Sequence, residues 1–155
     1  MGMDVIGRSP ISERGQYFRN NVWWWHPLWH YCMSVAPDII PRDNLGHSND
    51  GWGLPDRKAR KLADRLAAAL ASGETEQYAK DYATYLDQLP DEPCTICGGT
   101  GHRAEPPNIG PGVLSCNGCN ETGRVPSFEK HYPFSVENVR EFEAFLRDCG
   151  GFRIC

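Results

Sequence analysis

The sequence predicts an α+β protein that is mainly helical, with a helical hairpin, a C-terminal helix, small terminal strands and a cysteine-rich insertion. Three observations support this class: helical periodicity in the middle and near the end of the chain, short β-branched segments at both ends, and two Cys-x-x-Cys pairs in a stretch rich in Pro and Gly. A chain of 155 residues suits one compact domain with a small insertion. We expect residues 1–92 together with 127–155 to form the main domain and residues 93–126 to form the insertion.

Two amphipathic segments follow each other in the middle of the chain. The first begins at Pro55 and ends near Ser72, and Gly73 after it suits a helix C-terminal cap. The second covers residues 74–89 and carries tyrosines and leucines on one side. Because the connection is so short, we expect the two helices to form an antiparallel hairpin. The apolar stripe of the first helix consists of Ala59, Leu62, Ala63, Leu66, Ala69 and Leu70.

Two further helices are expected outside this pair. Ser135 suits the N-cap of a helix that ends near Asp148 and carries apolar residues at helical spacing. In the tryptophan-rich segment, Pro27 suits the first turn of a helix better than its interior. We therefore expect that helix to begin near His26 and to end near Val35.

The two ends of the chain carry the expected strands. Residues 3–6 and 152–155 are short and bounded by glycines, and we expect them to pair with each other. A third short strand is expected from the flank of the cysteine-rich insertion. Residues 15–21 are expected to form a turn that leads into an ordered segment.

Cys94, Cys97, Cys116 and Cys119 form two Cys-x-x-Cys pairs with 18 residues between them, the spacing of a four-thiolate zinc site. A two-residue gap lets the chain turn tightly and direct both sulfurs at one ion, and the glycines after each pair allow the positive φ angles of such turns. We expect one structural zinc ion in a zinc-knuckle insertion. A closed set of four thiolates leaves no open position for catalysis; His102 is the alternative ligand.

The first half of this segment, CTICGGTG, fits the Cys-x-x-Cys-x-Gly-x-Gly repeat and resembles the zinc domain of DnaJ-type chaperones. The second half, CNGCNETG, departs from the repeat because Glu121 stands where the repeat has glycine. That domain uses four repeats and two zinc ions, whereas two half-motifs suffice for one zinc. The resemblance covers about thirty residues, and it does not carry over the peptide-binding activity of the chaperone.

The charge of the chain disfavours a general nucleic-acid binder. Its net charge is −4, with acidic and basic residues mixed, whereas such binders usually have a basic excess. A nucleic-acid-binding zinc finger is therefore the weaker alternative. Its phosphate contacts would come from a local basic patch on the helix expected after Pro55, although such a run of charges is more typical of a solvated helix face. The patch consists of Arg57, Lys58, Arg60 and Lys61.

Seven cysteines are present, and the four in the knuckle leave Cys32, Cys149 and Cys155. Paired thiols hold metal more often than they form disulfides in reducing compartments. No hydrophobic signal segment begins the chain, and no apolar run reaches the roughly 18 residues of a membrane span. We therefore expect a cytoplasmic location without a membrane partner, which would be the host cytoplasm for a phage-encoded protein.

A candidate ligand site involves the segment with three consecutive tryptophans and the Gly-rich loop at residues 46–54. The tryptophans are more typical of an aromatic core, and the loop of an ordinary polar turn. The alternative is an aromatic wall with polar groups converging on a flat ligand. Tyr17 would support this site, whose candidate ligand-binding residues are Arg19, Asn20, Trp24, His47, Asn49 and Asp50.

His26 and His30 are four residues apart, so one helix face would carry both and allow joint metal binding, with His47 and Asp50 from the loop. The run His-Pro-Leu-Trp-His lacks the glutamate of a zinc protease. A nucleophilic pair of Cys32 with a histidine has no supporting local motif, and Cys32 is better interpreted as a small buried residue. The spacing of these groups therefore disfavours an enzyme.

Nearly the whole chain resembles a group of small bacteriophage proteins. The matching segments are Met1–Gly2 with Asp4–Val5, the run YFRNNVWWW at residues 17–25, GHSNDG at residues 46–51, the knuckle, and the ending GGF at residues 150–152. His26 occupies a position where this group would have Arg. The resemblance implies a phage setting without an activity. We expect a zinc-stabilised binding or regulatory protein that acts on a host protein or a nucleotide-like ligand, including interference with host defence. The alternative is a small-ligand-binding enzyme or sequestering protein.

Overall fold

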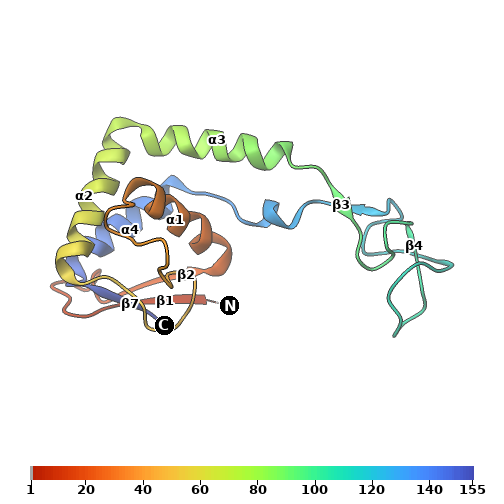
Figure 1. The fold of residues 1–155 in the computed structure, drawn as a ribbon, viewed down its shortest axis with the longest axis horizontal. Helices are drawn as coiled ribbons and strands as arrows, with labels where there is room; N and C mark the ends of the chain where they lie inside the picture. Colours follow the sequence, from red (N-terminus) through yellow and green to blue (C-terminus); the bar gives the residue numbers. More distant parts are fainter. Residues whose placement is uncertain (1) are drawn as a thin grey trace. The chain divides into compact units, whose positions relative to one another are not determined.

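The computed structural model describes residues 2–155 and divides the chain into two compact units (Figure 1). The first unit contains residues 1–84 and 132–155, and the second contains residues 85–131. The predicted α+β class is confirmed, since four helices and small antiparallel strands are present among the described residues. The second unit extends beyond the expected insertion on both sides, because the end of one helix and a 3₁₀ turn cluster with it.

A three-stranded antiparallel sheet forms the base of the first unit. It consists of β1 (Gly2–Gly7), β2 (Tyr17–Asn21) and β7 (Phe152–Ile154) in the order β2-β1-β7. Val5 lies opposite both Phe18 and Ile154, and all three side chains are buried. The pairing of the two termini is thus confirmed.

The third strand of this sheet was expected from the knuckle flank, and that expectation is wrong. It comes from Tyr17–Asn21, a segment that we expected to form a turn. Buried and exposed residues alternate along it, so Phe18 and Asn20 face the core. A hairpin with β1 is local in sequence and closes at little entropic cost, which favours it over a distant segment.

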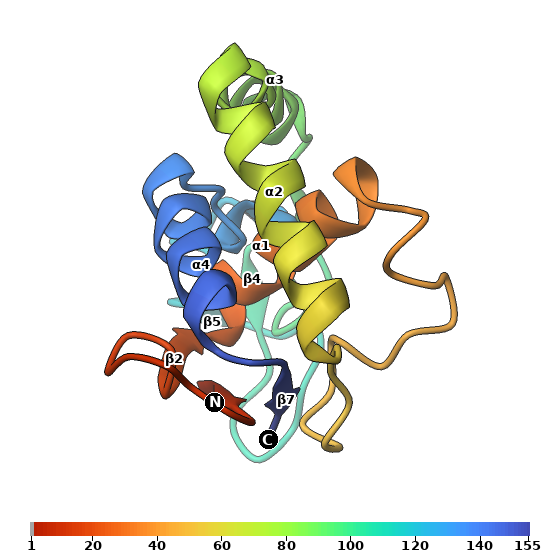
Figure 2. The same cartoon turned by 90° about the vertical axis from the view of Figure 1, so that its left-hand side faces the viewer.

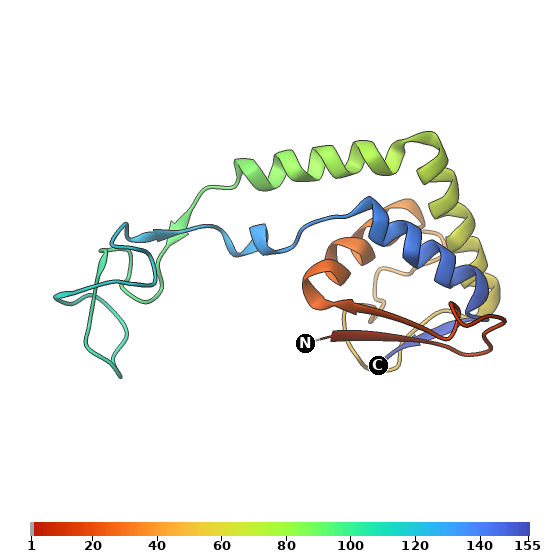
Figure 3. The same ribbon diagram turned by 180° about the vertical axis from the view of Figure 1, so that it is seen from behind.

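Three helices cover one face of this sheet: α1 (Val22–Val35), α2 (Asp56–Ser72) and α4 (Val136–Asp148) (Figures 2 and 3). α2 and α4 lie side by side, and the apolar stripes of both helices are buried between them and the sheet. Ser135 caps α4 as expected, its hydroxyl accepting the Asn138 N–H at 3.3 Å. Within residues 2–155, every helix is too short or too polar to cross a membrane.

α1 begins at Val22 and not near His26, so Pro27 lies inside the helix. The earlier start follows from Asn21, whose side chain caps the helix by accepting the Trp24 N–H at 3.1 Å. Trp25 and Trp29, one turn apart, are fully buried and stack with ring centroids 5.4 Å apart. These two tryptophans are therefore aromatic core.

α3 (Glu74–Gln88) follows α2 directly, but the two do not form the expected antiparallel hairpin. Gly73 between them has φ 81°, and the chain changes direction there (Figure 1). The apolar face of α2 is already covered by α4 and α1, so it offers no surface to α3. The start of α3 instead packs on α1, where the hydroxyls of Thr75 and Tyr31 lie 2.8 Å apart and Tyr78 contacts the Tyr31 ring.

The second unit is built from very short strands. β3 (Glu92–Pro93) pairs with β6 (Arg124–Val125), and β4 (His102–Arg103) pairs with β5 (Leu114–Ser115). A 3₁₀ turn, η1 (Phe128–His131), follows β6. The buried residues that form its core are the four knuckle cysteines, with Val125 packed against them. Since apolar burial is this small, the stability of the unit depends on what the cysteines bind.

Candidate metal centre and histidine cluster

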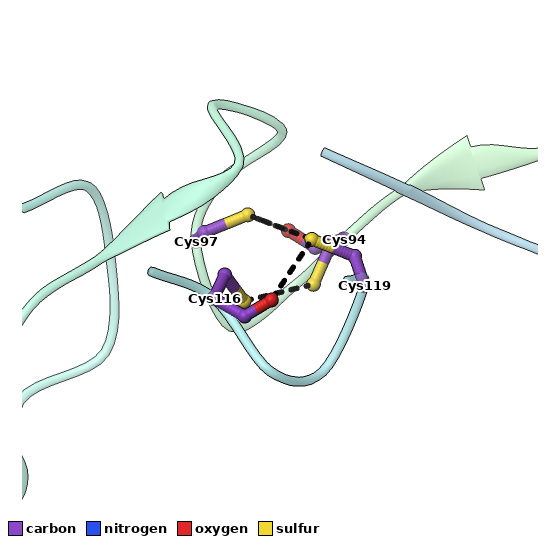
Figure 4. Close-up of side chains that lie close together, drawn as sticks. All are labelled: Cys94, Cys97, Cys116 and Cys119. Atoms are coloured by element: carbon purple, nitrogen blue, oxygen red, sulfur yellow. Dashed lines mark hydrogen bonds between the residues drawn. The ribbon is translucent and has the colours of Figure 1, made fainter. Parts of the chain in front are cut away.

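The four knuckle cysteines converge on one point (Figure 4). Their sulfurs all lie within 4.8 Å of one another, with Cys94 and Cys116 3.9 Å apart and Cys97 and Cys119 3.8 Å apart. These separations exceed the roughly 2.05 Å of a disulfide. They are close to the edge of about 3.8 Å in a tetrahedron of sulfurs 2.3 Å from a central ion. The four residues can therefore hold a metal ion, and all four are buried.

The two half-motifs repeat the same local structure. The Gly101 N–H donates to the Cys97 sulfur at 3.3 Å. The Gly123 N–H donates to the Cys119 sulfur, also at 3.3 Å. Both glycines have left-handed φ angles, 81° and 74°. A Cβ at Gly123 would lie 2.2 Å from the carbonyl oxygen of Gly99, so no larger residue fits there.

These N–H groups also affect the ionisation of the sulfurs. Burial raises the pKa of the Cys97 thiol, but the N–H groups of Gly101 and Gly99 and the thiols of Cys119 and Cys94 together outweigh it and lower that pKa to about 6. At Cys119 burial prevails over the Gly123 N–H and raises the pKa to about 11. The thiolate is the form that ligates metal. His102, the alternative ligand, lies in β4 with its side chain exposed, and the converging group consists of cysteines alone.

Glu121 is the position where the second half departs from the glycine pattern. It has φ 65°, the left-handed conformation that its counterpart Gly99 adopts with φ 85°. The fold keeps this conformation because the Glu121 N–H donates to the Cys116 carbonyl at 3.0 Å, as the Gly99 N–H does to Cys94 at 3.1 Å. A residue with a Cβ is strained there by roughly 1–2 kcal/mol.

We expect Glu121→Gly to stabilise the metal-loaded second unit by about 0.5–1 kcal/mol, because the relief of strain exceeds the entropy that glycine adds to the unfolded chain. The measurement is chelator competition for the bound ion, in which the variant should retain it more tightly. Gly99→Ala is the matched control: its Cβ meets only ordinary contacts, so it should lose about 1 kcal/mol from φ alone. Equal chelator sensitivity of both variants and the wild type would contradict this account.

The three remaining cysteines differ in burial. Cys32 and Cys149 are fully buried and Cys155 is partly exposed. Burial raises the pKa of the Cys32 thiol well above its usual value and that of Cys149 to about 11. A nucleophilic role for Cys32 would need a thiolate, so its position argues against one.

The candidate ligand-binding residues divide into separate groups of contacts. Asn20 is buried and donates its amide to Asn138 at 2.7 Å. The same Asn138 donates to the carbonyl of Trp24 at 3.3 Å, so it joins the two candidates. Asn138 lies in the first turn of α4, and no pattern in the sequence marked it as part of this site. Trp24 itself is 37% exposed.

The other candidates are Arg19 in β2 and the residues of the Gly-rich loop at residues 46–54. The guanidinium of Arg19 approaches Gly2, whose carbonyl accepts a hydrogen bond from the Asn49 side chain at 3.2 Å. Asp50 is exposed. The remaining candidate, His47, lies against two histidines of α1.

The basic residues of α2 are solvated, as expected of a helix surface. Arg60 pairs with Asp56 at 2.9 Å, and Lys58 donates to the carbonyl of Ile39 at 3.4 Å. Arg57 and Lys61 are exposed on the same helix. An exposed pair within one helix contributes little to the stability of the protein.

The structure brings His26, His30 and His47 together, as the spacing in the sequence suggested. The ring centroid of His47 lies 4.5 Å from that of His26 and 4.6 Å from that of His30. His26 also stacks on Tyr132, which the sequence did not associate with it. A signal was present in the repeat Trp25-His26 and Trp29-His30, which places indoles and imidazoles on adjacent faces of one helix.

Comparisons with protein-family models, with curated proteins and with solved structures find no match to this chain.

Proposed function

We propose that this chain is a zinc-stabilised protein-binding protein of bacteriophage type that regulates a host protein. Zinc is the ion that four converging thiolates at tetrahedral spacing favour, and a closed thiolate set suits a structural role. The observation that carries the binding role is an apolar surface on the same unit. Ile109 is 79% exposed and Val113 is 91% exposed.

These exposed side chains belong to a loop that is held to the metal site. The Gly110 N–H donates to the carbonyl of Ile96, which lies between the first two cysteines, at 3.0 Å. The Gly112 N–H donates to the carbonyl of His102 in β4 at 3.2 Å. Leu114 and Ile96 are themselves 40% and 42% exposed, so four apolar side chains are displayed. A loop fixed in this way loses little entropy when a partner covers it.

The charge of the second unit selects the class of partner. Residues 85–131 contain six acidic residues and three Lys or Arg. Four thiolates around a divalent ion add about two further negative charges. Such a surface repels the phosphates of nucleic acids. It suits a protein with an apolar pocket and a basic rim, which resembles the usual arrangement of an interface.

The test begins with the full-length, zinc-loaded protein as bait in a bacterial lysate, followed by affinity measurement with the purified captured protein. We expect the double variant Ile109→Ser with Val113→Ser to bind roughly 10–100-fold more weakly than the wild type. Ile11→Ser is the matched control, because Ile11 is 70% exposed but belongs to the first unit. It should bind like the wild type.

Two results would overturn the proposal. One is a lysate in which the wild type retains no protein that the double variant loses. The other is a partner whose binding depends on Trp24 or Asp50 and is unchanged in the double variant. That second result would place the binding surface on the tryptophan-rich segment and the Gly-rich loop at residues 46–54.

A further inference from the structure

We propose that His26, His30 and His47 form a second metal site, which binds a divalent transition-metal ion through three imidazoles. The site lies in the first unit and is independent of the knuckle and of the proposed protein-binding surface. We call these three residues the histidine cluster. The proposal depends on ring geometry, on the hydrogen-bonding state of His47 and on the way the loop before His47 is held.

The ring positions are close to those of ligands that share one ion. Two imidazoles bound to a tetrahedral ion through nitrogens about 2.0–2.1 Å from it have centroids roughly 5 Å apart. The centroid of His47 is 4.5 Å from that of His26 and 4.6 Å from that of His30. Within residues 2–155, only the cysteine group has ligand atoms already within 4.8 Å of one another. Binding at the histidine cluster therefore requires the rings to rotate about their side-chain bonds.

His47 has two buried polar atoms that no other group satisfies. Both ring nitrogens are inaccessible, and neither has a hydrogen-bond partner among the described residues. A buried nitrogen without a partner has lost its hydrogen bonds to water and gained none in the protein, which destabilises the fold. Coordination of a metal ion by one of these nitrogens would compensate much of that loss, which explains why an unpartnered histidine is buried here.

The rings of His26 and His47 also favour the protonation state that ligates. Burial, followed by the neighbouring His30 and His26, lowers the pKa of His47 to about 4. Burial and His30 lower the pKa of His26 as well. Neutral imidazole is the metal-binding form.

The loop that carries His47 is fixed by the two core tryptophans. The Trp25 indole donates to the carbonyl of Gly46 at 2.7 Å. The Trp29 indole donates to the side chain of Asn44 at 2.8 Å, and that side chain also accepts the Gly46 N–H at 2.9 Å. A Cβ on Gly46 would lie 2.0 Å from the Trp29 indole nitrogen, so only glycine fits. Trp25 and Trp29 thus fix the backbone next to His47. The residues that follow them in the chain, His26 and His30, supply the other two imidazoles.

The chemistry of the ligand set defines the class of ion. Three neutral imidazoles suit zinc, nickel, cobalt or copper and disfavour magnesium and calcium, which prefer oxygen ligands. His30 is exposed, whereas His26 and His47 are half-buried, so solvent reaches the cluster from the His30 side. Three protein ligands also leave a coordination position open.

The experiment is a titration of untagged, full-length protein that already contains one zinc ion, with nickel and then with cobalt as probes at neutral pH. We expect a second binding event with a stoichiometry of one per chain by calorimetry. With cobalt, the second event should lack the thiolate-to-metal charge-transfer absorption that a cysteine site produces. Absence of a second event in the wild type would overturn the proposal.

Variants locate the second ion. His47→Gln and His30→Gln should each weaken the second event roughly 10-fold or more. His102→Gln is the matched control, because His102 is an exposed histidine of the other unit, and its affinity should equal that of the wild type. Circular dichroism and retention of the first zinc show that each variant is folded. Wild-type affinity in folded His47→Gln protein would also overturn the proposal.

Discussion

Removal of the metal should unfold the second unit and leave the first unit folded. The buried core of residues 85–131 consists of the four cysteines with Val125, so few apolar contacts would remain after chelation. Structural zinc contributes on the order of 10–16 kcal/mol of apparent binding free energy in small zinc domains. The first unit has its own core of aromatic and aliphatic side chains.

Hydrogen exchange followed by mass spectrometry measures this directly. In the zinc-loaded protein, we expect protected amides in the segment 94–123, and after chelation their protection should disappear while that of β1, α2 and α4 remains. Cys116→Ser should behave like the chelated protein, and Cys155→Ser, outside the knuckle, like the zinc-loaded wild type. Protection of residues 94–123 in metal-free protein, or elemental analysis without one tightly bound zinc per chain, would contradict the structural role of the ion.

Truncation of Phe142 should produce the largest loss of stability of any single change in the first unit. Its ring packs against the rings of Phe18 in β2, Trp25 in α1 and Phe152 in β7. The ring centroids lie 5.1, 5.6 and 6.1 Å away, respectively. It therefore joins the sheet to the helices. Phe142→Ala removes a fully buried ring and should cost about 3–5 kcal/mol, which is a large share of the stability of a small domain.

Urea unfolding followed by tryptophan fluorescence tests this expectation, since Trp25 and Trp29 lie next to the Phe142 ring. Phe128→Ala is the control, because Phe128 is 57% exposed and belongs to the second unit. It should change the midpoint of the first-unit transition by less than the equivalent of about 0.5 kcal/mol. A Phe142→Ala midpoint within the same range would show that the aromatic core is not what stabilises this unit.

The sequence predicted the parts of the fold that short-range chemistry determines. Helical spacing located α2 and α4, Ser135 marked a cap, and the cysteine spacing identified a group that the structure brings within ligating distance. The terminal strands were also predicted, since Phe152 and Ile154 alternate with exposed residues. In each case the physical signal lies within a few residues.

The errors concern choices that neighbouring elements decide. Pro27 predicts a helix that begins near His26, but the Asn21 cap and the burial of Trp25 favour a longer helix with the proline inside it. The expected hairpin of α2 and α3 failed because α4, far along the chain, covers the face that α3 would have used. Neither fact is available from a local pattern.

The candidate site was only partly predictable for the same reason. The four-residue spacing of His26 and His30 showed that they share a helix face, but the position of His47 depends on two indole hydrogen bonds to the preceding loop. No sequence pattern predicts the exposure of Ile109 and Val113, because the Gly and Pro residues around them are typical of any irregular loop. Exposure of apolar side chains can be seen only once the fold shows that nothing in the unit covers them.

The hydrogen bond between the Tyr82 hydroxyl and the Tyr132 carbonyl, 2.9 Å long, has a consequence for how this protein can change during evolution. It joins the two points where the chain leaves and re-enters the first unit, so the residues between them form an insertion whose ends lie close together. A segment whose ends already lie together can be exchanged, shortened or deleted with little loss of chain entropy in the rest. The sequence of the knuckle can therefore change independently and produce new recognition surfaces, while the first unit keeps its core.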